Sequence, residues 1–535
     1  MNDNTVVSLK IEDLGTSGEG IGRADGLAVF VPGALPGDVV QAEITENKGR
    51  FAKGRLVCIE KSSEDRIEPD CPYFGQCGGC SLRNYSYGSQ LRWKEKAVRE
   101  ALKRIGGIEE PPVRPVIGAE DPLRYRNKAE FAVEKGLVGY YAPGSHRLIP
   151  IEDCLIQKEP AAALARALQA FLKKHPKNIY RHLVVRTSEF GKVMAIVVVN
   201  KNDVTHAQEL ADAFVSAVEE PYELVSLVVN INKDPLRRVL GDECIYLAGP
   251  RVLKDVIRTD AGELNIEVSP LSFTQVDPAQ CSRLYSKAQE YAALTGSETV
   301  LDLYCGTGTI GLSMAGRAAR IIGVESVRPA VIDANRNAVL NGIVNAEFIC
   351  GKAEEVVPKR LQGVRAQVVI LDPPRAGCRQ ELLDTVADIS PDRIVYVSCN
   401  PSTLARDVKI LSSRGYSLAE ATPVDMFPFS SHIETVVQLS KGNISSENVR
   451  VEFSLEDMDM SGFQQGATYE QIQQWVQEKY GFHVTHLNIA QVKRKYGIIE
   501  RENYNKPKSP NSRQPGCPEE KIKAIEAALK HFQMI

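Results

Sequence analysis

Short apolar runs, each bounded by turn residues, recur along residues 296–440 and alternate with stretches of helical periodicity. Runs that are apolar throughout and separated by helices are typical of parallel strands whose two faces are both covered. The pattern therefore predicts an α/β domain built on a doubly wound, mostly parallel sheet. Its seven expected strands lie at residues 300–304, 320–325, 346–350, 368–372, 393–398, 417–422 and 435–440.

The amino-terminal region has a different pattern. From residue 5 to about 60, apolar and polar residues alternate around regularly spaced glycines. This predicts a small antiparallel, OB-like β-barrel in a domain at residues 1–62. Four basic residues lie close to Phe51 in the sequence. They fit two alternatives equally: a face that binds nucleic acid and stacks a base, or a merely solvated hairpin. They are Lys48, Arg50, Lys53 and Arg55.

Residues 63–295 mix the two periodicities, which predicts an α+β central domain. Its expected helices are at about 90–105, 160–174 and 204–219, and its expected strands are at 128–134, 184–187 and 194–199. A basic and aromatic run, Arg124 to Lys128, fits an RNA contact or an exposed strand edge that carries charge for solubility.

Residues 441–535 form a carboxy-terminal extension whose role the sequence leaves open. A strand is expected at 450–455, and helices are expected from a capping box at Thr468 and Gln471 to about residue 480, at 486–496 and at 518–532. Two helices around Gly481 fit either a helix-turn-helix binding module or a plain helical cap. The basic character of this stretch is the reason for the first alternative.

Bulk composition narrows the class of protein. A chain of 535 residues is long enough for three or four domains, and 43% hydrophobic with 25% charged residues is ordinary for a soluble globular protein. The formal charge of −3 means that any RNA contact uses local basic patches. We expect a cytosolic chain with no membrane span and no obligate protein partner, and its twelve cysteines do not indicate a disulfide framework.

A glycine-rich turn at residues 304–309 follows the first strand of the α/β domain and opens a helix, so a ligand can approach the backbone there. Glu325 ends the next strand, 19 residues after Gly306, where an acid can accept both hydroxyls of a ribose. Gly311 stands three residues past Gly308, but Thr309 and Ile310 precede it and the helix has already begun, so it is not expected to cradle a phosphate as the third glycine of the dinucleotide fingerprint does. The turn therefore favours S-adenosylmethionine over NAD.

Two further strand ends carry chemistry. Asp372-Pro373-Pro374 follows the fourth strand, but Arg375 stands where amine methyltransferases carry an aromatic residue, so an amine target is disfavoured. Cys399 follows the fifth strand, and we expect the helix starting at Pro401 to favour its thiolate. A lone cysteine there would more often be a packing residue. A thiolate that adds to a pyrimidine, with Glu434 as a base, fits methylation of a ring carbon.

Cys71, Cys77 and Cys80 place three thiols within ten residues, and Cys154 is the candidate for a fourth ligand. Spacing alone leaves zinc and a [4Fe-4S] cluster equally open. A structural role is expected in either case, because methyl transfer moves no electrons.

These motifs together resemble the signatures of the RNA uracil-C5 methyltransferases. The resemblance covers residues 1 to about 440 and rests on the Asp-Pro-Pro-Arg-x-Gly run from Asp372, the Ser-Cys-Asn run around Cys399, and the Phe-Pro-x-Ser-x-His-x-Glu run that ends at Glu434. It implies a seven-stranded Rossmann-like methyltransferase domain and an amino-terminal RNA-binding module called TRAM. Phe429 departs from the family pattern, which usually has a polar or hydrogen-bonding aromatic residue there.

The resemblance also implies residue roles. Cys399 would add to uracil C6 and Glu434 would remove the C5 proton. S-adenosylmethionine would be bound by Gln275, Tyr304, Glu325 and Asp372, and the four cysteines would hold [4Fe-4S], as in the rRNA-modifying branch.

Within the family, TRAM and the cysteines favour 23S ribosomal RNA, because the tRNA branch typically lacks both. A single-stranded or loop uridine flipped out of its stack is expected. The alternatives are a tRNA uridine-C5 methyltransferase and an RNA-binding ribosome-assembly factor without activity, against which the intact Cys399 and Glu434 argue. The Pro-Cys and Thr-Cys pair of a cytosine-C5 methyltransferase was not found.

Overall fold

The computed structural model describes residues 4–203, 205–234, 238–361, 363–441, 469–496 and 518–531. The chain divides into two compact units, Met1–Ile444 and Ser445–Ile535, which are described separately here. Among the described residues, no helix combines the length and the apolar character needed to cross a membrane.

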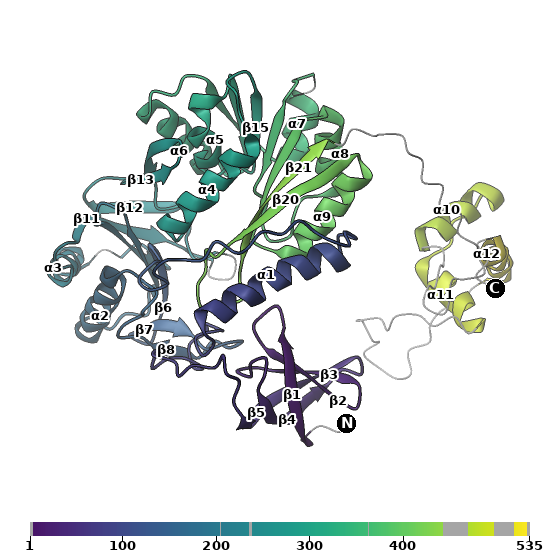
Figure 1. Cartoon of the computed structure of the whole chain (residues 1–535), viewed down its shortest axis with the longest axis horizontal. Helices are drawn as coiled ribbons and strands as arrows, with labels where there is room; N and C mark the ends of the chain where they lie inside the picture. The colour runs from purple at the N-terminus through teal and green to yellow at the C-terminus, as the bar shows by residue number, and fades with distance from the viewer. Residues whose placement is uncertain are drawn as a thin grey trace. The chain divides into compact units, whose positions relative to one another are not determined.

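The first unit begins with a closed five-stranded barrel, as the alternating pattern predicted, but the expected antiparallel arrangement is wrong for one pair, because its third and fifth strands run parallel (Figure 1). Its strands are β1 (Val6–Leu14), β2 (Gly20–Ala24), β3 (Leu27–Val31), β4 (Val39–Asn47) and β5 (Phe51–Lys61), in the order β1-β2-β3-β5-β4. Inward-facing side chains such as Leu9, Val29 and Ile44 fill it. Lys48 and Lys53 pair with Glu46, so the cations around Phe51 belong to a surface of mixed charge.

A long helix, α1 (Tyr87–Arg104), follows the barrel and the cysteine-containing segment, and it packs against α9 and β20 of the α/β domain (Figure 1). Buried residues Gln90, Lys94, Val98 and Leu102 recur every four positions, which forms a stripe along one face of the helix. The stripe places α1 between the cysteine segment and the catalytic sheet.

The central domain is a seven-stranded sheet in the order β12-β11-β10-β9-β6-β7-β8. The strands are β6 (Lys128–Glu134), β7 (Leu137–Tyr141), β8 (Leu148–Pro150), β9 (Tyr180–Thr187), β10 (Lys192–Val199), β11 (Glu223–Ile231) and β12 (Glu243–Ala248). Helices α2 (Glu159–Lys174) and α3 (Ala207–Ala217) cover one face with apolar side chains. A hairpin of β13 (Leu253–Thr259) and β14 (Gly262–Val268) leads to the next domain.

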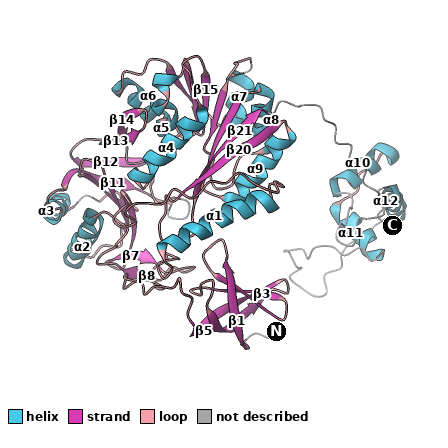
Figure 2. Cartoon of the chain, in the orientation of Figure 1, coloured by secondary structure: helices cyan, strands magenta, loops and turns pink. Residues whose placement is uncertain are grey.

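The α/β domain contains the seven strands that the sequence predicts, in the order β17-β16-β15-β18-β19-β21-β20 (Figure 2). They are β15 (Thr299–Leu303), β16 (Arg320–Glu325), β17 (Ala346–Cys350), β18 (Val368–Leu371), β19 (Arg393–Ser398), β20 (Tyr416–Val424) and β21 (Glu434–Lys441). The strands β15 to β19 are parallel, and β21 is antiparallel to both of its neighbours. The strand order reverses between β15 and β18, and open α/β sheets bind ligands at the carboxyl ends of the strands at such a switch point.

Helices cover both faces of this sheet, which explains the uninterrupted apolar runs. On one face pack α4 (Pro278–Ala292) and α5 (Thr309–Ser313). On the other pack α7 (Ala353–Arg360), α8 (Gln380–Ile389) and α9 (Pro401–Ser413), with α1 beside them. Helix α6 (Arg328–Leu340) packs on β14 and β17.

The second unit contains the three helices expected in the tail: α10 (Tyr469–Tyr480), α11 (His486–Lys495) and α12 (Glu519–His531). Their apolar faces share one core that includes Ile472, Ile489 and Ile525. The strand expected at 450–455 and the capping residue Thr468 lie outside the described residues.

Candidate active site

The carboxyl ends of four parallel strands bring together four of the residues that the sequence singled out. Tyr304 follows β15, Glu325 ends β16, Asp372 follows β18 and Cys399 follows β19. Because parallel strands end at the same edge of a sheet, these residues lie at one edge, at the switch point of the fold.

The glycine-rich turn after β15 has a backbone that ordinary residues adopt rarely. Tyr304, Gly306 and Gly308 have φ values of 61°, 55° and 76°. A Cβ atom at Gly308 would lie 2.6 Å from the Phe348 ring, so only glycine fits there. A positive φ at a tyrosine costs about 1–3 kcal/mol, and strain of this kind clusters at ligand sites.

Glu325 is held in place by the turn that it faces. Its carboxylate accepts hydrogen bonds from the backbone N–H of Gly306 at 3.1 Å and of Val327 at 2.7 Å. The Ser326 hydroxyl donates to the same carboxylate at 3.1 Å. A carboxylate has about four acceptor positions, so a ribose hydroxyl can take the remaining position or displace the Ser326 hydroxyl. The Tyr304 hydroxyl donates to Glu354 at 2.8 Å, which fixes the ring at the mouth of the same turn.

Asp372 is a half-buried carboxyl group at the centre of this edge. Desolvation raises its pKa to about 7. Asp302, two residues before the turn, is fully buried; burial raises its pKa to about 7, although the backbone N–H of Gly311 donates to it at 2.9 Å. Because both carboxyl groups are costly to ionise, a cation bound at this edge would stabilise their charged forms.

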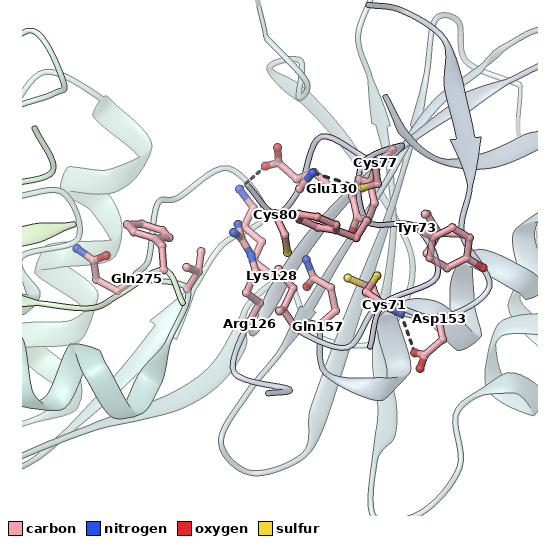
Figure 3. A pocket seen from close by; sticks show the side chains of 18 of the residues that line it. Cys71, Tyr73, Cys77, Cys80, Arg126, Lys128, Glu130, Asp153, Gln157 and Gln275 are labelled. Atoms are coloured by element: carbon pink, nitrogen blue, oxygen red, sulfur yellow. Dashed lines mark hydrogen bonds and ion pairs between the residues drawn. The ribbon is translucent and has the colours of Figure 1, made fainter. Parts of the chain in front are cut away.

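Gln275 lies in the loop between β14 and α4 and lines the cavity that also holds the four cysteines. Asn127 holds that loop, because its side-chain amide donates to the Gln275 carbonyl at 3.2 Å and its N–H donates to the Val276 carbonyl at 2.8 Å. Asp277 then caps α4 by accepting from the Gln280 N–H at 3.0 Å. Gln275 lies across the cavity from the cysteines in Figure 3.

Cys399 and Glu434 are neighbours across two paired strands. Ser398 is opposite Thr435 in the antiparallel β19–β21 pair, so the next residue on each side is Cys399 and Glu434. The Glu434 side chain is buried, and burial first and the nearby Asp372 second raise its pKa well above the usual range, while Arg375 lowers it. A nucleophile and a buried carboxyl group therefore face one point of the edge.

The expectation that helix α9 favours the Cys399 thiolate is wrong for the protein without ligands. Burial, and then the proximity of Glu434, raise the pKa of Cys399 to about 11, and Arg375 opposes them. Asn400 explains the weak effect of the helix. Its side chain accepts from the N–H groups of Ser402 at 2.9 Å and Thr403 at 3.4 Å, so the first amides of α9 already have a partner.

Arg375 is the cation of this site, and its loop is fastened to α9. Its backbone carbonyl accepts from the side chains of Asn400 at 3.4 Å and Thr403 at 3.2 Å. Farther along, Asp407 accepts from the Cys378 N–H at 2.8 Å. The loop after Asp372 and the helix after Cys399 therefore form one rigid support. The Arg375 guanidinium lies 3.4 Å from the His432 ring nitrogen.

Helix α1 supports the loop before Glu434, which the sequence analysis missed. The Lys94 ammonium lies 2.5 Å from the Asp425 carboxylate and also donates to the Phe427 carbonyl at 3.1 Å, and both ionic groups are fully buried. The Tyr87 hydroxyl donates to the other Asp425 oxygen at 2.9 Å. A lysine within the apolar stripe of α1 was the signal, because a buried lysine requires a partner.

The structure also brings together the four predicted ligand cysteines, which line one cavity of about 450 Å³ (Figure 3). Burial is the largest cause that raises the pKa values of Cys77, Cys80 and Cys154, and repulsion between the thiolates adds to it. Buried thiols that repel one another when ionised fit a shared metal centre, which supplies the missing positive charge. The residues present therefore fit the implied group.

The Arg124 to Lys128 run supports the cysteine site, besides any contact with RNA. The Arg124 guanidinium pairs with Asp153 at 2.7 Å and donates to the Cys154 carbonyl at 2.9 Å. Tyr125 is buried, and its hydroxyl donates to the Pro428 carbonyl at 3.3 Å. Two residues of the run therefore hold Cys154 and the loop before Glu434.

Comparison with known proteins decides the family. The model of the tRNA (uracil-5-)-methyltransferase family matches residues 87–442, and the model of the TRAM domain matches residues 2–57. The chain belongs to the tRNA (uracil-5-)-methyltransferase family. Membership makes it an S-adenosylmethionine-dependent enzyme that methylates uracil at C5 in RNA.

Relatives share nearly their whole length with the chain. An uncharacterized RNA methyltransferase of Halalkalibacterium halodurans is 42% identical over 83% of this chain and 98% of its own, and one of Caldanaerobacter subterraneus subsp. tengcongensis is 43% identical over 81% and 97%. Among solved structures, the Pyrococcus abyssi tRNA (uracil-54, C5)-methyltransferase in complex with S-adenosyl-L-homocysteine has a TM-score of 0.64 and 27% identity, and covers 81% of this chain and 100% of its own. The family match ends before the second unit.

Proposed function

We propose that this enzyme makes 5-methyluridine in 23S ribosomal RNA through a covalent bond between Cys399 and uracil. The observation that carries the mechanism is the pairing of β19 with β21, because it sets a thiol and a carboxyl group next to each other beside the ligand turn. Uracil C5 is a poor nucleophile until a group adds at C6. A cysteine at this edge supplies that group.

The proposed reaction has three steps. The Cys399 sulfur bonds to C6, and the electrons of the C5–C6 double bond move to C5 and the O4 enolate. C5 then takes the methyl group from the sulfonium of S-adenosylmethionine, which leaves as S-adenosylhomocysteine. Glu434 finally removes the C5 proton, the double bond re-forms, and the Cys399 thiolate leaves.

The raised pKa of Glu434 suits the last step, because a buried carboxylate is a stronger base than an exposed one. Arg375 is the cation that stabilises the ionised forms of both Cys399 and Glu434. Attack on C6 requires access to the face of the base. The substrate uridine is therefore proposed to be unpaired or in a loop and flipped into the site.

Binding of S-adenosylmethionine is proposed for Gln275, Tyr304, Glu325 and Asp372. Glu325 lies beside the glycine turn with a carboxylate that can accept from a ribose hydroxyl in place of, or besides, the Ser326 hydroxyl. Asp372 is half-buried at the same edge, where a sulfonium would favour its ionised form. The test is calorimetric titration of Glu325→Gln with S-adenosylmethionine, and we expect affinity to fall about tenfold or more, the ratio set by about 1.5–3 kcal/mol for a charged hydrogen bond.

A [4Fe-4S] cluster is proposed for Cys71, Cys77, Cys80 and Cys154. Support comes from four thiols on one cavity that has room for more than a single ion. The group would supply structural cross-linking, because the reaction moves no electrons. Anaerobically purified protein should contain about four iron atoms per chain and absorb broadly near ~400 nm. Stoichiometric zinc without iron would contradict the assignment.

The choice of ribosomal RNA rests on the combination of the TRAM domain with the four-cysteine site, which the resemblance associates with the rRNA branch. One observation favours tRNA as the second candidate: the Pyrococcus abyssi neighbour, which matches 81% of this chain, is a tRNA enzyme. The deciding experiment offers labelled S-adenosylmethionine with 23S rRNA or with tRNA that lacks 5-methyluridine. Labelling of the tRNA alone would replace the proposal.

A further inference from the structure

Phe429 lies in the loop between Asp425 and Glu434 and has a conformation that is unusual for phenylalanine. Its φ is 64°, in the left-handed region, and its side chain is only 7% exposed. The left-handed region costs an ordinary residue about 1–2 kcal/mol. Surrounding contacts must therefore hold Phe429 in place.

The backbone of Phe429 is bound to the segment that carries Cys80. Its carbonyl accepts two hydrogen bonds, from the N–H of Ser81 at 3.0 Å and of Leu82 at 2.9 Å. The Ser431 N–H donates to the Ser81 hydroxyl at 3.1 Å. These contacts begin at the residue after Cys80, so a shift of Cys80 moves the partners of the loop.

The ring of Phe429 belongs to a buried cluster beside the cysteine site. It shares this cluster with Tyr125 and Ile156, and Cys80 and Cys154 pack against the cluster. The Arg83 guanidinium stacks 3.9 Å from the ring centre. Arg83 in turn pairs through two bonds, of 2.6 and 2.7 Å, with Asp70, the residue before Cys71. The ring is therefore linked to two of the cysteines through its cluster and to the segment of a third through Arg83.

We propose that Phe429 is a positioning residue through which the filled four-cysteine site holds Glu434 in place. This inference rests on the proposed function of Glu434 and on metal binding by the cysteines. When the site is filled, the segment around Cys80 and the segment around Cys154 are cross-linked, and the Phe429 ring and carbonyl fit between them. Glu434 follows five residues later. An empty site, or a smaller side chain at 429, releases the loop and slows removal of the C5 proton.

The proposal separates two steps of the reaction. Addition of Cys399 depends on β19 and α9, whereas proton removal depends on Glu434, which is held both by the β19–β21 pair and by the loop that Phe429 positions. With Phe429→Leu we expect turnover on uridine RNA to fall about tenfold, and a covalent enzyme–RNA adduct to accumulate on ordinary uridine. Trapping on 5-fluorouridine RNA, which needs no proton removal, should stay within about twofold of wild type.

Two further variants serve as controls. Phe171→Leu makes the same change at a phenylalanine of similar burial, in α2, and should change neither rate. Phe429→His keeps a ring, and histidine tolerates the left-handed region, so it should restore most of the turnover. If turnover and trapping fall in parallel in Phe429→Leu, or if neither falls, the positioning role is wrong.

A readout without catalysis tests the link to the cysteine site. Coupling between two sites is reciprocal, so loss of the ring should also loosen the metal centre. We expect chelator to bleach the visible absorbance of Phe429→Leu several times faster than that of wild type or Phe171→Leu. Removing the metal from wild type should speed amide hydrogen exchange in residues 425–434. Equal bleaching rates, or unchanged exchange, would overturn the coupling.

Failure of the inference is distinguishable from failure of the proposed function. Wild-type enzyme that forms no adduct with 5-fluorouridine RNA contradicts the covalent mechanism itself. Wild-type enzyme that forms the adduct, with a Phe429→Leu variant that loses trapping and turnover equally, contradicts only the role of Phe429.

Discussion

Cys399 and Glu434 are held next to each other by the backbone, since Ser398 pairs with Thr435 where β19 runs antiparallel to β21. A strand pair is a stiff support, so the spacing of the two side chains does not depend on a flexible loop alone. The same burial that shields the pair from water raises the pKa values of both groups. The consequences are open to direct measurement.

Replacement of Glu434 by Gln should block the last step while sparing the first. We expect turnover to fall by about 10²–10⁴-fold, the usual contribution of a general base, and a covalent adduct to accumulate on ordinary uridine RNA. A denaturing gel with labelled RNA measures both effects. Glu420→Gln, in the neighbouring strand β20, is the matched control, because Glu420 pairs with Arg114 away from Cys399. The role of Glu434 as base is wrong if its variant accumulates no more adduct than wild type.

The pH dependence should reflect the raised pKa of Cys399. The reactive form is the thiolate, and burial, followed by Glu434, raises the pKa of the thiol to about 11. The rate of adduct formation on 5-fluorouridine RNA, under kcat/KM conditions, should therefore rise throughout the range from pH 6 to 9. Arg375 lowers this pKa, so Arg375→Met should slow trapping at pH 7 and Arg375→Lys should restore part of it. A flat profile would contradict the assignment.

Asp372→Asn should stabilise the folded protein and still weaken its binding of S-adenosylmethionine. Burial raises the pKa of Asp372 from 3.8 to about 7 in the folded state, so the folded form holds a proton that the unfolded chain releases between these values. The contribution of Asp372 to the stability of the fold is therefore fully present at low pH and is lost as the pH rises toward 7. Removing the charge should raise the free energy of unfolding at pH 8 by about 2–4 kcal/mol, from three pKa units. S-adenosylmethionine affinity should fall.

Asp38→Asn is a control for which the opposite change in stability is expected. Burial alone would raise the pKa of Asp38, but hydrogen bonds from Arg66, Ser63 and Leu35 outweigh it and lower the pKa. Its stabilising effect is present above the unfolded pKa and lost in acid. Asp38→Asn should therefore lower stability at pH 8. Denaturant unfolding of both variants at pH 5 and 8 decides, and Asp372→Asn that is less stable than wild type at pH 8 contradicts the account.

Replacing only one partner of the buried Lys94–Asp425 ion pair should destabilise the fold more than replacing both. Both ions are fully buried, so Lys94→Met leaves a buried carboxylate without its cation and should cost about 3–5 kcal/mol in the free energy of unfolding. The double change Lys94→Met with Asp425→Asn should recover part of this loss. Lys96→Met on the same helix, whose partner Asp13 is exposed, should cost less than about 1 kcal/mol. Equal losses for Lys94→Met and Lys96→Met would contradict the buried pair.

The sheet around the site could be predicted well because its strands are apolar on both faces and are followed by turn residues, as after Leu303 and Leu371. The contacts of α1 could not. Lys94 and Asp425 are 331 residues apart, and periodicity shows a stripe but not its partner. The state of Cys399 was mispredicted for a local reason. The helix that follows it was recognised, but not that the Asn400 side chain would take the amides that a thiolate needs.

Phe429 shows a similar limit. From the sequence it is only a departure from a motif, whereas in the fold its left-handed backbone and buried ring join the loop of Glu434 to Cys80 and Cys154. Neither φ nor packing across a distance of 350 residues can be read from local composition.

The most direct test of the central claim is covalent trapping of the enzyme on 5-fluorouridine RNA in the presence of S-adenosylmethionine. Mass spectrometry of the product should show one RNA fragment bound through Cys399 in wild type and in Cys350→Ala, whose cysteine ends β17, the parallel strand at the far edge of the same sheet. Cys399→Ala should form no adduct and transfer no methyl group to ordinary uridine RNA. An adduct on another residue, or full methylation by Cys399→Ala, would contradict the account.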